Sequence, residues 1–153
     1  MLAALCLPVA VAGCAPPPEP EEPDTIVNIT FSAMPDLNPD VDGRPSPAVI
    51  GVFALTDQDA FRTASYFELR DETEEVLGDS LLAERDLLIN PGASIERRIT
   101  FPNEARVLGV AVDFQNIEAA VWRSFISIRQ GEETNLRATL TGDQVRLTLL
   151  RDN

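Results

Sequence analysis

Few side chains in this sequence are able to do covalent chemistry. The chain has two cysteines, Cys6 and Cys14, and it contains no histidine and no lysine. Histidine is the commonest general base and metal ligand, so its absence excludes a Ser-His-Asp triad, a Cys-His pair and imidazole metal sites. The absence of lysine excludes the phosphate-binding loop of nucleotide hydrolases, whose lysine contacts the phosphates. The reactive groups that remain are the two thiols and the carboxylates.

Cys14 follows an apolar segment. Leu2 to Ala12 carries no charge, and it is long enough for the hydrophobic region of a signal peptide but too short to span a bilayer as a helix. The small residues Ala12 and Gly13 let an extended chain enter a narrow peptidase site, as in a bacterial lipobox. We therefore expect residues 1–13 to be a lipoprotein signal peptide and Cys14 to carry a diacylglycerol and an N-linked acyl chain. The alternative is an apolar strand or helix at the start of a soluble protein.

The next ten residues have the composition of a spacer. Ala15 to Asp24 contains five prolines and four acidic residues, so it cannot pack a core and is expected to be extended and solvated. Its reach is about 30 Å at ~3.1 Å per residue. Residues 14–24 are therefore predicted to tether the following domain to a membrane. Position 15 is alanine rather than aspartate, which indicates the outer membrane under the enterobacterial sorting rule.

The whole chain is strongly acidic. It has 25 acidic residues against 12 basic ones, all of them arginine, and a formal net charge of −13. This balance argues against nucleic-acid binding, because nothing in it neutralises a row of phosphates. The excess negative charge lies before residue 94, and its simplest interpretation is a solvated surface.

From Asp24 onward the hydrophobic pattern is mostly that of strands. Val27, Ile29 and Phe31 alternate with polar residues, which predicts a half-buried strand. The other strand-like runs are Ala48–Leu55, Ser94–Phe101, Leu108–Phe114 and Trp122–Ile128. Several short strands separated by turn signals indicate an all-β domain, an antiparallel β-sandwich, over residues 25–153.

The clearest local signal is a hairpin near the C-terminus. Gly142 and Asp143 suit a two-residue loop, which would pair position 140 with 145, 138 with 147 and 136 with 149. All three pairs are apolar and would lie on one face, so the predicted register is self-consistent.

One helical insertion is predicted between the strands. Ser65, with Glu68 three residues later, forms a capping box. An apolar stripe at helical spacing runs along residues 66–77, and Gly78 is suited to end the helix. A shorter helix is expected near residues 59–63.

The segment from Ala33 to Pro47 has an unusual composition, with four prolines, three aspartates and one glycine. Prolines lower the ordering cost of a binding loop, and loops on rigid scaffolds commonly carry binding. The segment is therefore either a protruding recognition loop or a loop whose apolar residues, Met34, Leu37 and Val41, fold back on the sandwich.

The acidic residues give weaker signals for a metal or a catalytic site. Asp36, Asp40 and Asp42 offer oxygen ligands for calcium, but their spacing does not match the EF-hand pattern. A glycosidase would need two carboxylates that flank one cleft, and the sequence singles out no such pair.

The run Gly43–Pro47, with the sequence Gly-Arg-Pro-Ser-Pro, and the apolar strand Ala48–Asp57 that follows resemble a motif of the TssJ family. These proteins are the outer-membrane lipoproteins of type VI secretion systems. Gly51 interrupts the strand and is expected to cost some strand stability. The resemblance covers most of residues 25–150. It continues through Phe61, Ala64, Phe67, Leu88–Gly92, Gly109 and Ala119–Arg123.

The resemblance implies a transthyretin-like antiparallel β-sandwich with a short helical insertion and a protruding loop between the first two strands. It implies no catalysis and no cofactor besides the covalent lipid on Cys14. It places the protein on the periplasmic face of the outer membrane, bound to the periplasmic C-terminal region of TssM and through TssM to TssL. The partner-binding residues implied by position are Met34, Pro35, Asp36, Leu37, Asn38, Pro39, Asp40, Val41, Asp42 and Gly43.

The acidity of this loop leads to a further expectation about the partner. The facing TssM surface should carry arginine or lysine, with Leu37 or Met34 of the loop as the apolar anchor, and added salt should mainly slow association. Two other functions remain open. One is an unrelated outer-membrane β-sandwich lipoprotein that binds a glycan or small ligand in a pocket with exposed aromatic side chains. The other is an enzyme that works with carboxylates.

Overall fold

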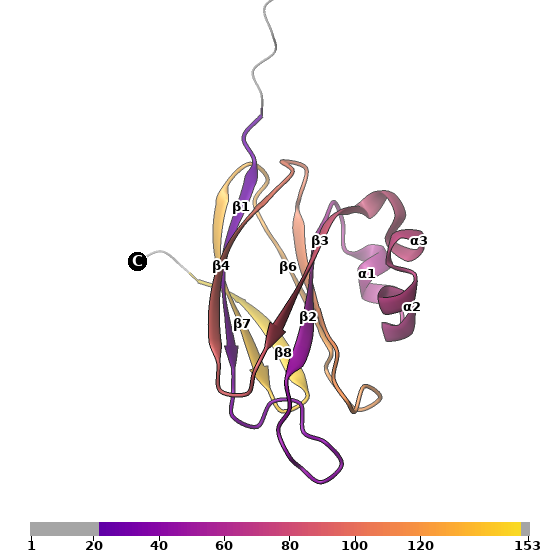
Figure 1. The fold of residues 1–153 in the computed structure, drawn as a ribbon. Coiled ribbons are helices and arrows are strands. Elements are labelled where there is room, and N and C mark those ends of the chain that lie inside the picture. Colours follow the sequence, from indigo (N-terminus) through magenta and orange to yellow (C-terminus); the bar gives the residue numbers. More distant parts are fainter. Residues whose placement is uncertain (1–21, 151–153) are drawn as a thin grey trace, which may run out of the picture.

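The computed structural model describes residues 22–150, which form two facing four-stranded sheets (Figure 1). The predicted signal peptide, Cys14 and most of the tether lie outside the described residues. The first sheet has the strand order β4-β1-β7-β8 and the second has the order β3-β2-β5-β6. The strands are β1 Thr25–Ala33, β2 Ala48–Leu55, β3 Leu81–Ile89, β4 Ser94–Phe101, β5 Val107–Val112, β6 Arg123–Ser127, β7 Glu133–Thr141 and β8 Gln144–Leu149.

Short helices separate β2 from β3 and lie on the outer side of the second sheet (Figure 1). They are α1 Asp59–Thr63, α2 Tyr66–Asp71, α3 Thr73–Leu77 and the 3-10 turn η1 Gly78–Ser80. None of the helices within residues 22–150 is long and apolar enough to cross a membrane.

The prediction of an all-β sandwich is confirmed, with one difference in strand direction. Every neighbouring pair of strands is antiparallel except β1 and β7, which run parallel over eight residue pairs. Successive strands alternate in direction along the chain (Figure 1). The odd-numbered strands therefore share one direction, and two of them become neighbours when β7 pairs with β1. This contact joins residues far apart in the sequence, and local patterns do not report it.

The main core lies between the two sheets and is built from alternate side chains of each strand. Val27, Ile29 and Phe31 point inward from β1 and are buried, as their spacing predicts. Leu136 and Leu140 lie beside them on β7 of the same sheet, in the predicted hairpin register that pairs them with Leu149 and Val145. Each large apolar side chain removed from water in this way contributes roughly 1.5–3 kcal/mol.

A second cluster of buried side chains fixes the helices to the outer face of the second sheet. Phe61 of α1 is fully buried, and its ring lies 5.3 Å from the ring of Phe53 and 6.3 Å from that of Phe125. The ring rests on Gly109 of β5, where a Cβ atom would lie only 2.8 Å from Phe61 Cζ. Gly109 is therefore needed for the close approach of α1 to the sheet.

The helical prediction is right at its ends and wrong in the middle. Ser65 and Glu68 form the predicted capping box, and Gly78 at φ +48° ends α3. The single helix expected over residues 66–77 is broken at Glu72, which has φ −135° and ψ 35°. The Thr73 hydroxyl donates a 2.5 Å hydrogen bond to the carbonyl of residue 69, and such side-chain bonds compete with the helical backbone.

Candidate functional site

The loop between β1 and β2, residues 34–47, projects from one end of the sandwich (Figure 1). The described chain begins at the opposite end, and β1 runs the length of the domain between the two (Figure 1). The loop is therefore displayed at the end that is remote from the start of the described chain.

The base of this loop is tied to the neighbouring turns by backbone hydrogen bonds. The Met34 N–H donates to the Leu140 carbonyl at 2.8 Å, and the Met34 carbonyl accepts from the Gly92 N–H at 3.2 Å. The Asn38 N–H donates to the Gly142 carbonyl at 2.7 Å. These bonds connect the loop to the β3–β4 turn and to the β7–β8 turn, so its base is held on two sides.

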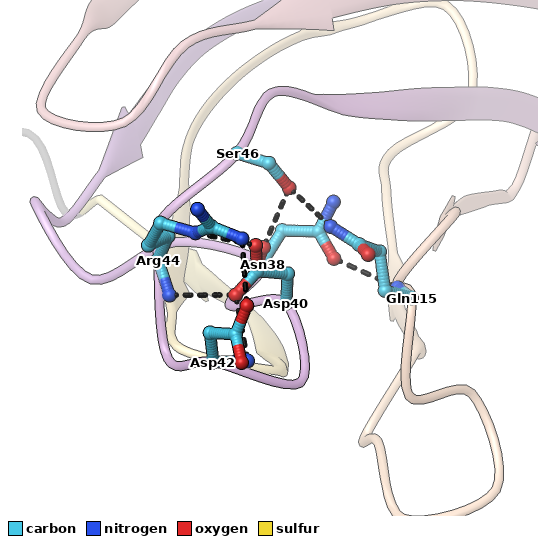
Figure 2. A network of polar contacts seen from close by, with 6 residues as sticks. All are labelled: Asn38, Asp40, Asp42, Arg44, Ser46 and Gln115. Atoms are coloured by element: carbon cyan, nitrogen blue, oxygen red, sulfur yellow. Dashed lines mark hydrogen bonds and ion pairs between the residues drawn. The ribbon is translucent and has the colours of Figure 1, made fainter.

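Asn38 braces the centre of the loop (Figure 2). Its φ of +48° is in the left-handed region, which asparagine tolerates better than most residues. Its amide group donates to the Pro47 carbonyl at 2.8 Å, and its side-chain oxygen accepts from the Gln115 N–H at 2.8 Å. Ser46 adds a third connection, because its hydroxyl donates to the Asn38 carbonyl and accepts from the Gln115 side chain. The loop is thus also joined to the segment that follows β5.

The apolar residues of the loop divide into two groups. Leu37 is fully buried in the main core, so the fold-back interpretation is right for this residue. Its side chain is not available as an anchor for a partner in this structure. Val41 is fully exposed (102 %) and Met34 is exposed (46 %). The buried Leu37 holds the loop on the sandwich, and the exposed Val41 leaves an apolar side chain at its tip.

The tip of the loop is a turn closed by charged side chains (Figure 2). The Gly43 N–H donates to the Asp40 carbonyl at 2.9 Å, and Gly43 has φ +78°, which favours glycine. The Arg44 side chain pairs with Asp40 at 3.0 Å and with Asp42 at 2.7 Å. One arginine side chain therefore neutralises part of the negative charge of the two aspartates at the tip.

Backbone N–H groups lower the pKa of Asp40. The N–H of Arg44 has the largest effect, and the Arg44 side chain and the N–H of Asp42 add to it. Both oxygens of Asp40 are occupied by these donors. The calcium hypothesis gains nothing from this arrangement, since Asp42 also faces the guanidinium group. Within residues 22–150, no group of three or more His, Cys, Asp or Glu side chains is placed to hold a metal ion.

The predicted partner-binding residues differ in their accessibility. Two of them, Leu37 and Asn38, are buried, and two, Pro39 and Asp40, are half-buried. The exposed ones are Met34, Pro35, Asp36, Val41, Asp42 and Gly43.

Comparison with protein families decides the assignment. Residues 25–143 match the family model described as type VI secretion lipoprotein, VasD, EvfM, TssJ. The chain belongs to this TssJ family.

Solved structures support the family assignment. The T6SS lipoprotein TssJ1 from Pseudomonas aeruginosa is 27% identical, with a TM-score of 0.81, over 86% of this chain and 100% of that chain. Lip from Serratia marcescens, titled a membrane bound component of the type VI secretion system, shares the fold at 23% identity, with a TM-score of 0.75 over 85% of this chain and 99% of that one. The described domain therefore matches the crystallised TssJ1 chain over the full length of that chain.

A third similar chain comes from a structure titled "T6SS protein TssM C-terminal domain (869-1107) from EAEC". It is 21% identical, with a TM-score of 0.69, over 82% of this chain and 98% of that one, and it shows the same fold. A comparison with curated proteins gives no match.

The motif that carries the resemblance to the TssJ family has a structural role in the loop. Arg44 closes the tip, Ser46 bridges Asn38 and Gln115, and the carbonyl of Pro47 accepts the Asn38 amide. Sequence reasoning marked the Gly43–Pro47 run as distinctive but missed Gln115. Composition singled out the loop, whereas Gln115 lies 77 residues from Asn38 and nothing local connects the two.

Proposed function

We propose that this TssJ-family lipoprotein is a non-enzymatic adaptor that binds the periplasmic C-terminal region of TssM through the β1–β2 loop. In this proposal residues 1–13 are the signal peptide, Cys14 carries the lipid, residues 14–24 are the tether and residues 25–153 are the docking domain. The lipid holds the protein on the periplasmic face of the outer membrane, and TssM links it indirectly to TssL.

The observation that carries this proposal is the placement of Val41. It is fully exposed at the tip of a loop that hydrogen bonds tie to three neighbouring segments. The loop lies at the end of the domain opposite the tether (Figure 1). A domain anchored through its N-terminus would therefore present this loop away from the outer membrane. A braced loop binds at a lower ordering cost than a flexible one, and an apolar side chain at its tip is a suitable anchor.

The identity of the partner is supported by two structures that contain similar chains. One is titled for the TssM C-terminal domain and the other "Type VI membrane complex". We propose that the exposed loop residues make the contacts, with Met34 and Val41 as apolar anchors. Leu37 and Asn38 then act by positioning the loop.

A glycan-binding function is less well supported by the surface. Phe67 is the one aromatic residue among the exposed large hydrophobic side chains of residues 22–150. The guanidinium of Arg70 lies 5.1 Å from the centre of its ring, which leaves little free aromatic surface for a sugar.

Direct binding tests the proposal. The domain, residues 22–153, is immobilised for biolayer interferometry against the TssM periplasmic C-terminal region from the same genome. The variant Met34→Ser/Val41→Ser removes the apolar anchors and keeps Leu37 and Asn38. We expect saturable binding that weakens by about tenfold or more in this variant, as for truncated interface anchors.

A matched control replaces Leu149, an exposed leucine outside the loop, with serine. This variant should bind like the parent. Equal losses in both variants would assign the contact to general surface hydrophobicity. Binding that is unchanged in the loop variant would move the interface onto the sandwich, and no binding by the folded domain would refute the adaptor role.

A further inference from the structure

A small cavity of about 130 Å³ lies on the outer face of the second sheet, beneath α2. Its floor is formed where Gly51 of β2 stands beside Asp86 of β3 on one side and Ala111 of β5 on the other. The two smallest side chains of this row, at Gly51 and Ala111, are adjacent. The ring of Phe53 lies over Gly51, with its Cε2 atom 2.9 Å from where a Cβ of residue 51 would stand, so this ring forms part of the floor.

Apolar groups form the walls of the cavity. Phe53 lies two residues along β2 from Gly51, and Tyr66 and Leu69 reach the cavity from α2. Val49 stands on the side nearest the β1–β2 loop, and its cross-strand neighbour Leu88 is also exposed. The Arg70 guanidinium lies 5.4 Å from the centre of the Tyr66 ring, so Phe53 supplies the aromatic surface that is left for an occupant. Val49 and Leu88 form an apolar rim outside.

The charge of the cavity is negative. Glu84, Asp86 and Asp113 all line it. Arg70 lines it as well, but its guanidinium is held by Asp71 at 2.8 Å. Asp113 accepts a 2.5 Å hydrogen bond from the Tyr66 hydroxyl. Glu84 and Asp86 form no ion pair within residues 22–150, so they are the carboxylates of the cavity that an added cation would meet.

The environment of Glu84 reflects this excess of negative charge. Its pKa is raised, first by burial and then by repulsion from Asp86 and Glu74. A cation placed beside Glu84 would relieve both effects, because it would replace lost solvation and offset the like charges.

We propose that this cavity takes the guanidinium end of an arginine side chain from a basic segment of a protein partner. The volume is well below the roughly 300–1,000 Å³ of small-molecule pockets. The occupant is therefore a single side chain. Arginine suits the site better than lysine because its planar group stacks on aromatic rings and pairs with two carboxylate oxygens at once.

This site goes beyond the proposed docking loop, since its residues come from β2, β3, β5 and α2 and include none of residues 34–47. It gives some of the excess acidic residues before position 94 a specific role, which is to bind one arginine of a basic segment. The two sites are separable by experiment because a peptide can probe the cavity without TssM.

The test is an NMR titration of ¹⁵N-labelled residues 22–153 with the peptide acetyl-Gly-Gly-Arg-Gly-Gly-amide. The comparison peptide carries citrulline, which has the shape of arginine without its charge. We expect saturable shifts centred on the amides of Gly51, Phe53 and Ala111, with citrulline binding about tenfold weaker. This factor lies between those for exposed and for buried charge pairs.

Two cavity variants and one control complete the test. Glu84→Gln/Asp86→Asn removes charge, and Ala111→Leu fills the hollow; each should weaken binding of the arginine peptide by about tenfold. Glu75→Gln/Asp79→Asn makes the same charge change on exposed acids outside the cavity and should leave the affinity unchanged. The proposal is overturned if citrulline binds as well as arginine, if the shifts fail to saturate, or if the control variant loses as much affinity as the charge variant. The spectrum of each variant shows directly whether it is folded.

Discussion

The side-chain oxygen of Asn38 accepts a 2.8 Å hydrogen bond from the backbone N–H of Gln115, 77 residues further along the chain. This bond joins the loop that leaves the first sheet to the segment that leaves the second. Because the same amide group also holds the Pro47 carbonyl, one side chain connects the centre of the loop both to its exit and to the segment after β5.

Replacement of Asn38 should loosen the loop and lower stability. Asn38→Ala leaves the Pro47 carbonyl and the Gln115 N–H without their side-chain partner and puts alanine at φ +48°. We expect a loss of about 2 kcal/mol in the free energy of unfolding. Asn38→Gly loses the same bonds without the backbone strain and should lose less. Urea unfolding followed by the fluorescence of the single tryptophan measures both, and equal stability of Asn38→Ala and the parent would contradict the brace.

The contact of Phe61 with Gly109 should not tolerate an added methyl group. Gly109→Ala places a Cβ 2.8 Å from the Phe61 ring and should cost about 1–3 kcal/mol by overpacking. The double variant Gly109→Ala/Phe61→Leu should lose less than the sum of the two single changes, since the smaller side chain leaves room for the methyl group. Thermal or urea unfolding of the four proteins gives the coupling, and strict additivity would show that the two residues do not press on one another.

Tyr66 should titrate unusually high. Burial, together with the 2.5 Å hydrogen bond to Asp113 and the charge of that carboxylate, raises its pKa to about 12. The folded pKa lies above the unfolded value of about 10, so this contribution to stability is complete below pH 10 and is lost as the pH rises towards 12. Tyr66 is the only tyrosine of the chain, so absorbance at 295 nm follows it alone.

Two comparisons test the origin of that shift. The midpoint should fall to about 10 in denaturant and should move down in Asp113→Asn. The variant Asp86→Asn changes the same charge without removing the hydrogen bond and should have the smaller effect. A folded-state midpoint near 10 in the parent would contradict the burial of this phenol.

The salt dependence of partner binding should be controlled by Arg44. This side chain pairs with Asp40 and Asp42 and so offsets part of the negative charge of the loop. Association of the parent domain with TssM should slow only modestly as salt is raised. Arg44→Gln leaves both aspartates without that offset and should make the association rate fall more steeply with salt. Rate constants at several ionic strengths measure this, and identical slopes for parent and variant would show that the loop charges do not face the partner.

Local features of the fold were predictable because the physical cause was local. The register of the last hairpin follows from three apolar pairs and a two-residue loop, and the structure confirms each pair. The capping box at Ser65 and the turn at Gly78 are similar cases. The break at Glu72 was missed because the apolar stripe of residues 66–77 continues through it. A pattern of apolar spacing does not register the Thr73 hydroxyl, which competes with the helical backbone for a carbonyl.

Contacts between distant segments were not predictable in this way. The parallel pairing of β1 with β7 and the bond from Gln115 to Asn38 depend on how the two sheets meet. Leu37 illustrates the same limit within the candidate site. A leucine in this loop suits either a contact with a partner or a place in the core. Only the path of the folded chain shows that Leu37 is buried.

The arrangement of β1 has a mechanical consequence. The described chain enters this strand at one end and the β1–β2 loop leaves it at the other (Figure 1). A pull between a lipid anchor and a partner held by the loop would run along β1 and load it in shear. Eight residue pairs with β4 and eight with β7 would then share the force at the same time, instead of opening one after another as in a peeled strand. With the proposed anchor and docking loop at its two ends, β1 would carry tension through both of its neighbouring strands together.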